Sequence, residues 1–449
     1  MNKVTKEEIE RLLDEKKFQE IKERLSLLNE MDAAELISLL DDDKIVPIFR
    51  LLPKDMAADI FANFPSNVQH FIISKITDQE TSALIEEQMV DDAVDILEEL
   101  PANVVNKILR NVTAEQRQQI NQFLSYPDES VGSVMTAEFI KIKKNMNVSQ
   151  ALGIIRKMAK DVEEVSSCYV VDDKRMLEGV VYLKDLLIAN DSDVVEDIMD
   201  KNVIFSTAYD DRESAASLVK KYDLLSLPVV DKENRLVGIV TVDDIIDVLE
   251  DEVTEDIEKM AAVLPNDEEY LKTSVFRLAR NRIVWLALLM FSSVFSSLII
   301  GSKEKLLQEL TILAAFIPML TDTGGNAGSQ TASIIIRSMA VGEIRAKDFL
   351  RTIWKEMRVA LLVGLIMAVF AFIRVFLQYH DNISLCFSIS ISLFFTVLIA
   401  KIIGCCLPFL ARFLNIDPAL MASPVISTIM DAITLIIYFY VANSILGVH

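Results

Sequence analysis

Histidine, cysteine and glycine are scarce in this chain of 449 residues, which contains 3, 4 and 12 of them. The histidines and cysteines stand at none of the close spacings, such as CxxC, that ligate zinc or iron, so neither metal has an obvious site. The GxxxxGK[ST] motif of P-loop nucleotide hydrolysis is also missing from the sequence. A nucleotide, if one binds, is therefore expected to be regulatory, and we expect a protein that is not an enzyme.

Basic residues are few in the first part of the chain. Before Arg277 there are 58 acidic and 31 basic residues, a net charge of −27, whereas 9 acidic and 14 basic residues follow from that point. A surface this acidic repels phosphates, so we expect no nucleic-acid partner. The first residues also lack the apolar segment of a secretory signal, so we expect the acidic part to lie in the cytoplasm.

Two internal repeats divide the acidic part. Residues 1–130 have the pattern of short helices, and AADIFANFP at 57–65 recurs as AVDILEELP at 93–101, a period typical of stacked helical hairpins. In residues 131–252 a βαββα pattern occurs twice, since the segment 169–187 returns at 228–246. We therefore expect an all-α helical-repeat domain over 1–130, followed by a tandem pair of α/β modules over 131–252.

An acidic helix is expected to connect these modules to the rest of the chain, over residues 245–275. Carboxylates recur there every three or four residues, which places on one face Asp244, Asp247, Asp251, Glu255 and Glu258. Like charges at this spacing repel one another. Something outside the helix must therefore compensate them.

Five apolar segments follow, within a domain over 276–449, at residues 283–300, 309–336, 357–377, 383–407 and 418–442. The first has 18 uncharged residues, enough for a helix to cross a hydrocarbon core of about 30 Å. Basic residues gather in the loops on the side of the acidic part, which by the positive-inside rule places the N-terminus in the cytoplasm and the C-terminus outside. The sequence thus predicts a multi-pass protein of a bacterial plasma membrane.

Asp431 lies midway along the last apolar segment, where a charge costs about 2.5–3.5 kcal/mol. Ser427 and Thr428 lie on the same helical face. We expect no Lys or Arg at similar depth, so a cation is the natural partner. A helix held to its neighbours by polar contacts, or a protonated Asp431, remains the alternative.

The segment PMLTDTGGNAGSQ, residues 318–330, is the second unusual feature of the apolar part. Its three glycines favour backbone that unwinds beside a water-filled cavity, with close helix packing at the glycines as the alternative. Asp322, Asn326 and Gln330 form an oxygen-rich stripe. Oxygen ligands without imidazole or thiolate select hard cations, and so few carboxylates favour a largely hydrated Mg²⁺.

The duplicated modules resemble a tandem pair of CBS domains, which hold adenine nucleotides in their clefts. In that family a G-h-h-T-x-x-D turn places its Asp on a ribose and its Thr near phosphate. The resemblance implies nucleotide-binding roles, with ATP as one candidate, for Thr241 and Asp244. The first module has Tyr182 in place of the Thr, and modules that only dimerise remain the alternative.

The order of the parts, the segment from Pro318 to Gln330 with its GGNAG, the DPA at 417–419 and the late Asp431 together resemble the MgtE family of magnesium channels. The resemblance implies a homodimer whose pore lies between the subunits, with Asp431 holding hydrated Mg²⁺ and the acidic helix acting as a plug. It also implies that cytosolic Mg²⁺ is sensed by Asp91, Asp95, Asp247, Asp251, Glu255, Glu258 and Asp417. We therefore expect a Mg²⁺-selective, channel-like importer that cytosolic Mg²⁺ closes; a secondary exchanger of a divalent cation for Na⁺ or H⁺ remains the alternative.

Overall fold

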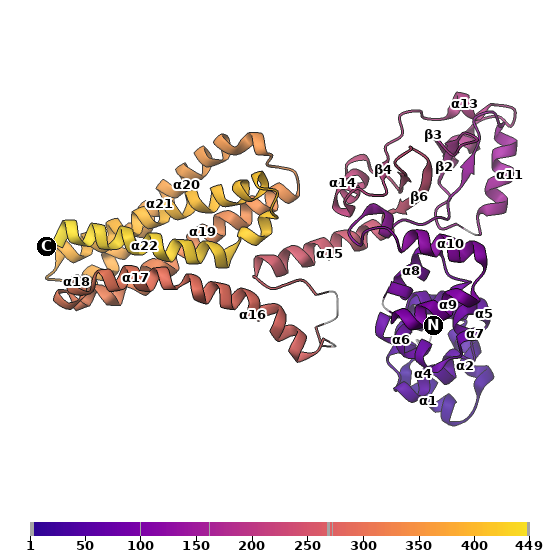
Figure 1. Ribbon diagram of the computed structural model, residues 1–449, viewed down its shortest axis with the longest axis horizontal. Helices are drawn as coiled ribbons and strands as arrows, with labels where there is room; N and C mark the ends of the chain where they lie inside the picture. The colour runs from indigo at the N-terminus through magenta and orange to yellow at the C-terminus, as the bar shows by residue number, and fades with distance from the viewer. Residues whose placement is uncertain (1–3, 99, 161, 267–269, 272, 447–449) are drawn as a thin grey trace. The chain divides into compact units, whose positions relative to one another are not determined.

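The computed structural model describes residues 4–446 except 99, 161, 267–269 and 272. The chain forms two compact units, residues 1–250 and 251–449, and each is described by itself (Figure 1). The first unit holds the helical domain and the two α/β modules. The second holds the rest of the acidic helix and the apolar helices.

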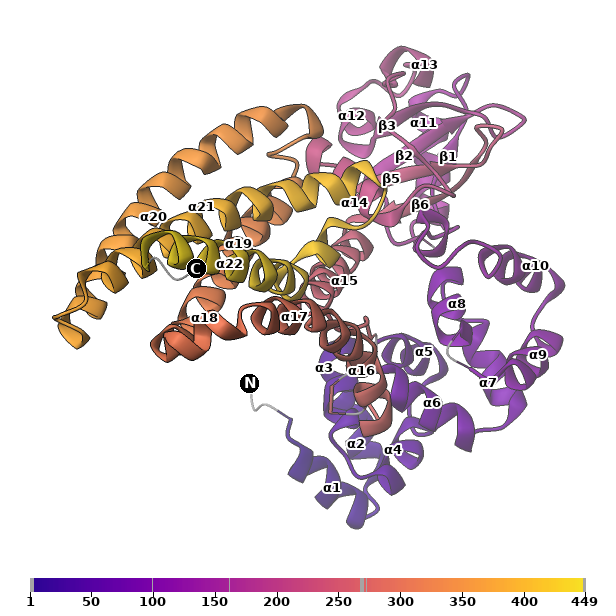
Figure 2. The ribbon, with the colours of Figure 1, turned by 60° about the vertical axis from the view of Figure 1, so that its left-hand side comes forward.

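The helical domain consists of short helices (Figure 2). Their apolar faces share one core. The set α5 to α7 returns 36 residues later as α8 to α10, which confirms the predicted repeat. Thr77 starts α7 with a capping box, in which its hydroxyl and the Glu80 carboxylate satisfy the first backbone N–H groups. The helices are α1 Lys6–Asp14, α2 Phe18–Leu25, α3 Glu30–Ser38, α4 Asp42–Phe49, α5 Lys54–Ala62, α6 Ser66–Lys75, α7 Asp78–Ile85, α8 Val90–Glu98, α9 Ala102–Asn111 and α10 Ala114–Phe123.

The two α/β modules have the same three-stranded sheet, in the orders β1-β2-β3 and β4-β5-β6, each with a parallel and an antiparallel pair. Their registers match with an offset of 59 residues, since Ser167 pairs with Tyr182 and Ser226 with Thr241. The repeat seen in the sequence is therefore a structural repeat. Its elements are β1 Lys141–Ile142, α11 Val148–Met158, β2 Ser167–Val171, β3 Leu177–Tyr182, α12 Leu183–Ile188, α13 Val195–Ile198, β4 Ser206–Thr207, α14 Arg212–Tyr222, β5 Ser226–Val230 and β6 Leu236–Thr241.

The acidic helix α15 runs over Val242–Met260. Ala262 then adopts a left-handed backbone with φ of 55°, and Pro265 follows, so the helix cannot continue. The helix therefore ends well before residue 275, the boundary expected from the sequence.

The second unit is a bundle in which α19, α21 and α22 pack against one another and α20 packs along α21 (Figure 1). Among the residues that the structure describes, four segments are long and apolar enough to cross a membrane: Val275–Ser302, Ala346–Gln378, Ile383–Phe413 and Pro418–Leu446. The remaining expected span is α19, which is 24 residues long but carries the polar segment 318–330. The helices are α16 Val275–Ser292, α17 Val294–Ser302, α18 Glu304–Glu309, α19 Ile317–Ala340, α20 Phe349–Gln378, α21 Ile383–Phe413 and α22 Ser423–Leu446.

Candidate ion pathway and carboxylate clusters

The glycines of segment 318–330 let α19 approach its neighbours closely. A Cβ atom added at Gly324 would lie 2.7 Å from the Thr434 hydroxyl of α22, and one added at Gly328 would lie 2.6 Å from a methyl of Ile426. On α21, a Cβ at Gly404 would lie 2.2 Å from the carbonyl oxygen of Gly328. Small residues at these positions are what allow the three helices to pack.

The expectation of unwound backbone in this segment is wrong. The helix α19 is continuous from Ile317 to Ala340, through all three glycines. Glycine weakens a helix by only about 1 kcal/mol relative to alanine, and the contacts with α21 and α22 outweigh that cost. Close helix packing, the alternative reading of these glycines, is the one that the structure shows.

The predicted pore residues lie on two helices that pack together, α19 and α22. Asp322 and Asn326 are exposed on α19, whereas Asp431 is half-buried on α22. Ser427 faces Gly325, whose added Cβ would lie 3.0 Å from its hydroxyl, and Thr428 donates a hydrogen bond to the Pro424 carbonyl at 3.0 Å. Polar oxygens thus line a face of this single chain that lipid cannot solvate.

The sequence reasoning overlooked one base inside an apolar segment, Lys401 on α21. Its side chain is 6% exposed and donates to the Thr331 hydroxyl at 3.3 Å, and that hydroxyl in turn contacts the Glu356 carboxylate at 3.3 Å. The expectation that no Lys or Arg lies at a similar depth to Asp431 stays a prediction, since Lys401 contacts α19 at Thr331. Through Thr331, Lys401 links α21 to α19 and α20.

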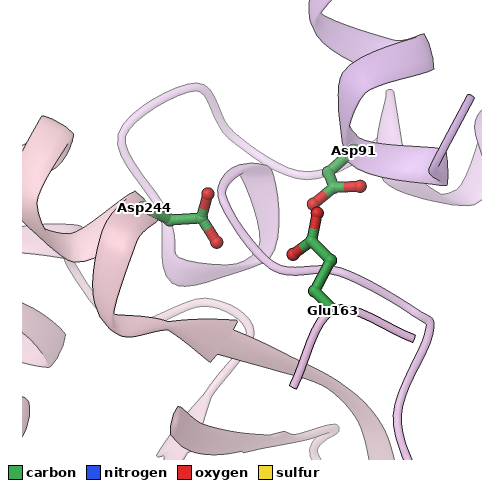
Figure 3. Close-up of side chains that lie close together, drawn as sticks. All are labelled: Asp91, Glu163 and Asp244. Atoms are coloured by element: carbon green, nitrogen blue, oxygen red, sulfur yellow. The ribbon is translucent and has the colours of Figure 1, made fainter. Parts of the chain in front are cut away.

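In the first unit, Asp91, Glu163 and Asp244 each place a carboxylate oxygen within 4.8 Å of the others (Figure 3). Asp91 lies in the first turn of α8 and Asp244 in the first turn of α15, while Glu163 follows α11. The acids of the helical domain and of both modules thus converge. The sequence reasoning named Asp91 and Asp244 but missed Glu163, because nothing in its local sequence shows that the chain folds it against α8.

These carboxylates repel one another. Burial, and then the neighbouring negative charge of Asp92, raise the pKa of Asp91 to about 9. Burial followed by the charge of Asp244 raises the pKa of Glu163 to about 7. One oxygen of Asp91, Oδ1, is buried without a hydrogen-bond partner. A buried, unpaired oxygen facing two other carboxylates is the donor set of a hard divalent cation, and it therefore fits Mg²⁺.

The other predicted residues of the first unit lie outside this cluster. Asp95 and Asp247 are exposed, on α8 and α15 respectively. The hydroxyl of Thr241 donates to Oδ2 of Asp244 at 2.5 Å, so the two residues expected to bind a nucleotide are bonded to each other. The carboxylate of Asp244 thereby joins the cluster of acids, where a phosphate would be repelled.

A cleft of about 800 Å³ lies between the two modules, on a part of their surface that neither Thr241 nor Asp244 lines. Tyr169 and Tyr182 contribute aromatic rings to it and Lys184 a positive charge, and Ser226 and Pro228 line it from the second module. Asp200 and Asp223 also line the cleft. Its size, its aromatic rings and its hydroxyls suit the base and ribose of a nucleotide, and Lys184 is the cation available to a phosphate.

In the second unit, Lys259 holds two of the predicted sensing acids together. Its ammonium group lies 2.6 Å from Glu255 and 2.8 Å from Asp417, which also caps the short η4 helix Pro418–Met421. Glu258 instead accepts from the backbone N–H of Asn266 at 3.0 Å. Asp251 is exposed. The sequence reasoning placed these acids on one face but missed the lysine that neutralises part of their charge.

Comparison with known proteins bears on all parts of the chain. The family model "MgtE: Divalent cation transporter" matches residues 317–441, "MgtE intracellular N domain" matches 28–129, and "CBS domain" matches 131–191 and 195–251. The magnesium transporter MgtE of Thermus thermophilus is 39% identical over 331 residues, which cover 74% of this chain and 73% of that protein. The chain belongs to the MgtE family of magnesium transporters. The expectation of a transporter rather than an enzyme is thereby confirmed.

Two further comparisons extend this result. The MgtE transporter of Bacillus subtilis is 34% identical over 74% of this chain and 73% of that protein. A crystal structure titled as the cytosolic domain of the Mg²⁺ channel MgtE in complex with ATP covers 54% of this chain and 98% of that one, at 31% identity and a TM-score of 0.51. The predicted architecture of a helical domain, a CBS pair and an apolar helical domain is that of this family.

Proposed function

We propose that this MgtE-family chain is a channel-like Mg²⁺ importer of the bacterial plasma membrane, with its pathway along α19 and α22. The observation that carries the proposal is the polar face formed by Asp431, Asp322 and Asn326 within an otherwise apolar bundle. Hard oxygen donors suit a hydrated Mg²⁺. A membrane potential of about 100 mV favours entry of a divalent ion by about 4.6 kcal/mol, so no coupled reaction is needed.

A homodimer completes this pathway. Asp322 and Asn326 are exposed in the single chain, and lipid is a poor environment for both. A second copy related by a two-fold axis would cover that face and bring two Asp431 carboxylates to one ion.

Cytosolic Mg²⁺ closes the pathway by bridging acids. The cluster of Asp91, Glu163 and Asp244 would hold one ion between the helical domain and the CBS pair. Asp95, Asp247 and Asp251, exposed along the same helices, would extend this sensing surface. Without the ion, mutual repulsion of the carboxylates opposes the closed arrangement. ATP in the cleft between the CBS modules would act as a regulatory ligand.

Flux through the purified protein in liposomes tests the proposal. With a potential imposed and no Na⁺ or H⁺ gradient, we expect wild-type vesicles to take up Mg²⁺, and Asp431→Asn to reduce uptake at least about tenfold, the effect of losing about 1.4 kcal/mol of ion stabilisation. Ser444→Ala, at an exposed hydroxyl near the other end of α22, serves as the matched control. Equal uptake by Asp431→Asn would remove the pore assignment, and uptake that requires a Na⁺ or H⁺ gradient would favour an exchanger.

A further inference from the structure

A cavity of about 330 Å³ lies between α10 of the helical domain and the CBS pair, away from the carboxylate cluster and from the cleft between the modules. Three glutamine side chains of α10 line one wall, Gln118, Gln119 and Gln122. The charged residues in its lining are Lys141 of β1, Arg175 of the β2–β3 turn, and Glu115 of α10. Two positive charges therefore face one small polar cavity in the most acidic part of the chain.

Neither of these cations forms an ion pair within the described part of the chain. Their neighbours in sequence behave differently, since Lys143 pairs with Asp173 and Lys144 with Glu178. The ammonium group of Lys141 instead lies 5.3 Å from the ring centre of Phe139. Burial, together with the positive charge of Arg175, lowers the pKa of Lys141. An anion bound between these two cations would relieve their repulsion.

The backbone at Arg175 shows that the fold does not itself require an arginine. Arg175 has a φ of 66°, in the left-handed region, which costs a residue with a Cβ about 1–2 kcal/mol. The equivalent residue of the second module is Asn234, with a φ of 60°, and asparagine tolerates this conformation. The turn is fixed by Asp172, whose Oδ1 accepts from the N–H groups of Lys174 and Met176. Asparagine would adopt this turn at a lower cost, so the turn itself does not account for an arginine at position 175.

We propose that this cavity binds a small oxyanion of the phosphate class, either free phosphate or the phosphoryl group of a small metabolite. The guanidinium of Arg175 supplies paired N–H donors, the ammonium of Lys141 a point charge, and the amides of Gln118 and Gln119 further donors. Both cations retain exposed area, so a ligand can reach them from solvent. The bound anion would join α10 to the CBS pair. This inference does not depend on the proposed Mg²⁺ transport.

Acylation of Lys141 measures occupancy of the cavity directly. The full-length protein in detergent is pulsed with an amine-acylating reagent, without Mg²⁺ and at constant ionic strength, and the rate at each lysine is read by mass spectrometry. At inorganic phosphate ten times its Kd, labelling of Lys141 should slow about tenfold relative to chloride, because only about one cavity in eleven stays empty. Lys174, exposed in the same turn but outside the cavity, should react at an unchanged rate.

Variants in one turn make the test specific. Arg175→Asn keeps a residue suited to the left-handed turn and should abolish the protection of Lys141, whereas Lys174→Asn should keep it. Glu115→Gln should lower the phosphate concentration needed, since it removes the carboxylate from the lining. Protection by phosphate identifies the free anion, and protection by glycerol 3-phosphate alone identifies a phosphorylated metabolite. Unchanged labelling with both anions, or full protection in Arg175→Asn, would overturn the proposal.

Discussion

Asp91 is buried beside other acids, so its protonation state affects the stability of the first unit at neutral pH. A carboxyl group whose pKa is raised in the folded state stabilises the fold while it is protonated. That stabilisation is complete below the pKa of the unfolded chain and is lost as the pH rises through the folded value, here about 9. Glu163 has a second raised pKa, of about 7. The loss of stability therefore extends over the whole pH range from the pKa of an unfolded carboxyl group to about 9.

We expect the metal-free first unit to lose stability as the pH rises from about 5 to 9, by at most about 1.4 kcal/mol per pH unit for each proton released. Asp91→Asn should flatten this dependence, and Mg²⁺ should reduce it in the wild type. Cys168 is fully buried in the first CBS module, so the urea dependence of its thiol labelling in the full chain reports the unfolding of this unit.

Asp32→Asn is the control, since Asp32 is exposed on α3 of the same helical domain. It should leave the pH dependence as it is in the wild type. A wild-type stability that stays constant or increases between pH 5 and 9 would contradict the raised pKa values.

At the scale of the elements, α15 depends on Lys259 to keep Glu255 next to Asp417. Burial, with the charge of Asp417 as the second cause, raises the pKa of Asp256 on the same helix, so the acids around Lys259 oppose one another. A fixed ammonium group and a soluble Mg²⁺ are alternative ways of neutralising them.

Lys259→Gln should therefore free α15 from η4 when Mg²⁺ is absent. Limited proteolysis between residues 245 and 275 should be faster than in the wild type without Mg²⁺, and millimolar Mg²⁺ should slow it in both proteins. Lys201→Gln, which removes an exposed ion pair with Glu196, should not change the rate. Cleavage of Lys259→Gln at the wild-type rate in EDTA would show that the lysine does not hold the helix.

The contact between α19 and α21 gives a second prediction for an element. Gly404→Ala would place a methyl group 2.2 Å from the Gly328 carbonyl, where the two backbones leave no room. We expect the variant to lose about 1–3 kcal/mol of stability, the usual cost of overpacking. On heating, its monodisperse chromatographic peak should disappear at a lower temperature than that of the wild type. At Gly301 an added methyl group would contact nothing within 4 Å, so Gly301→Ala should change this temperature little. Equal behaviour of the two variants would mean that the helices are not closely packed there.

At the scale of the whole molecule, the polar face of α19 should be covered by a second copy. A cysteine at Asn326 should form an intersubunit disulfide under mild oxidation in the membrane, seen as a dimer on a non-reducing gel. A cysteine at Leu365, exposed on the apolar α20, should remain monomeric under the same conditions. A monomer in both cases would place the pathway within one chain.

The sequence was sufficient for the architecture because each part carries a periodic signal: a 36-residue helical repeat, a duplicated βαββα unit and long apolar segments. It failed where tertiary contacts override local preference. Glycines that favour unwinding in isolation lie in the unbroken α19, because only they fit against Thr434 and Ile426. Glu163 was missed because the acids it faces are distant in sequence, and the link from Lys259 to Asp417 for the same reason. Lys401 was missed because one charge hardly changes the hydropathy of its segment.

One residue of α21 has a consequence for how the second unit can move. Pro408 lies inside this helix and has no N–H to offer the carbonyl of Gly404, the residue against which α19 rests. Bending of α21 at this point therefore has one backbone hydrogen bond fewer to break than elsewhere in the helix. Asp417 follows shortly after the last turns of α21, so a force on its carboxylate would be transmitted to the end of α21 and would change how that helix packs along the proposed pathway.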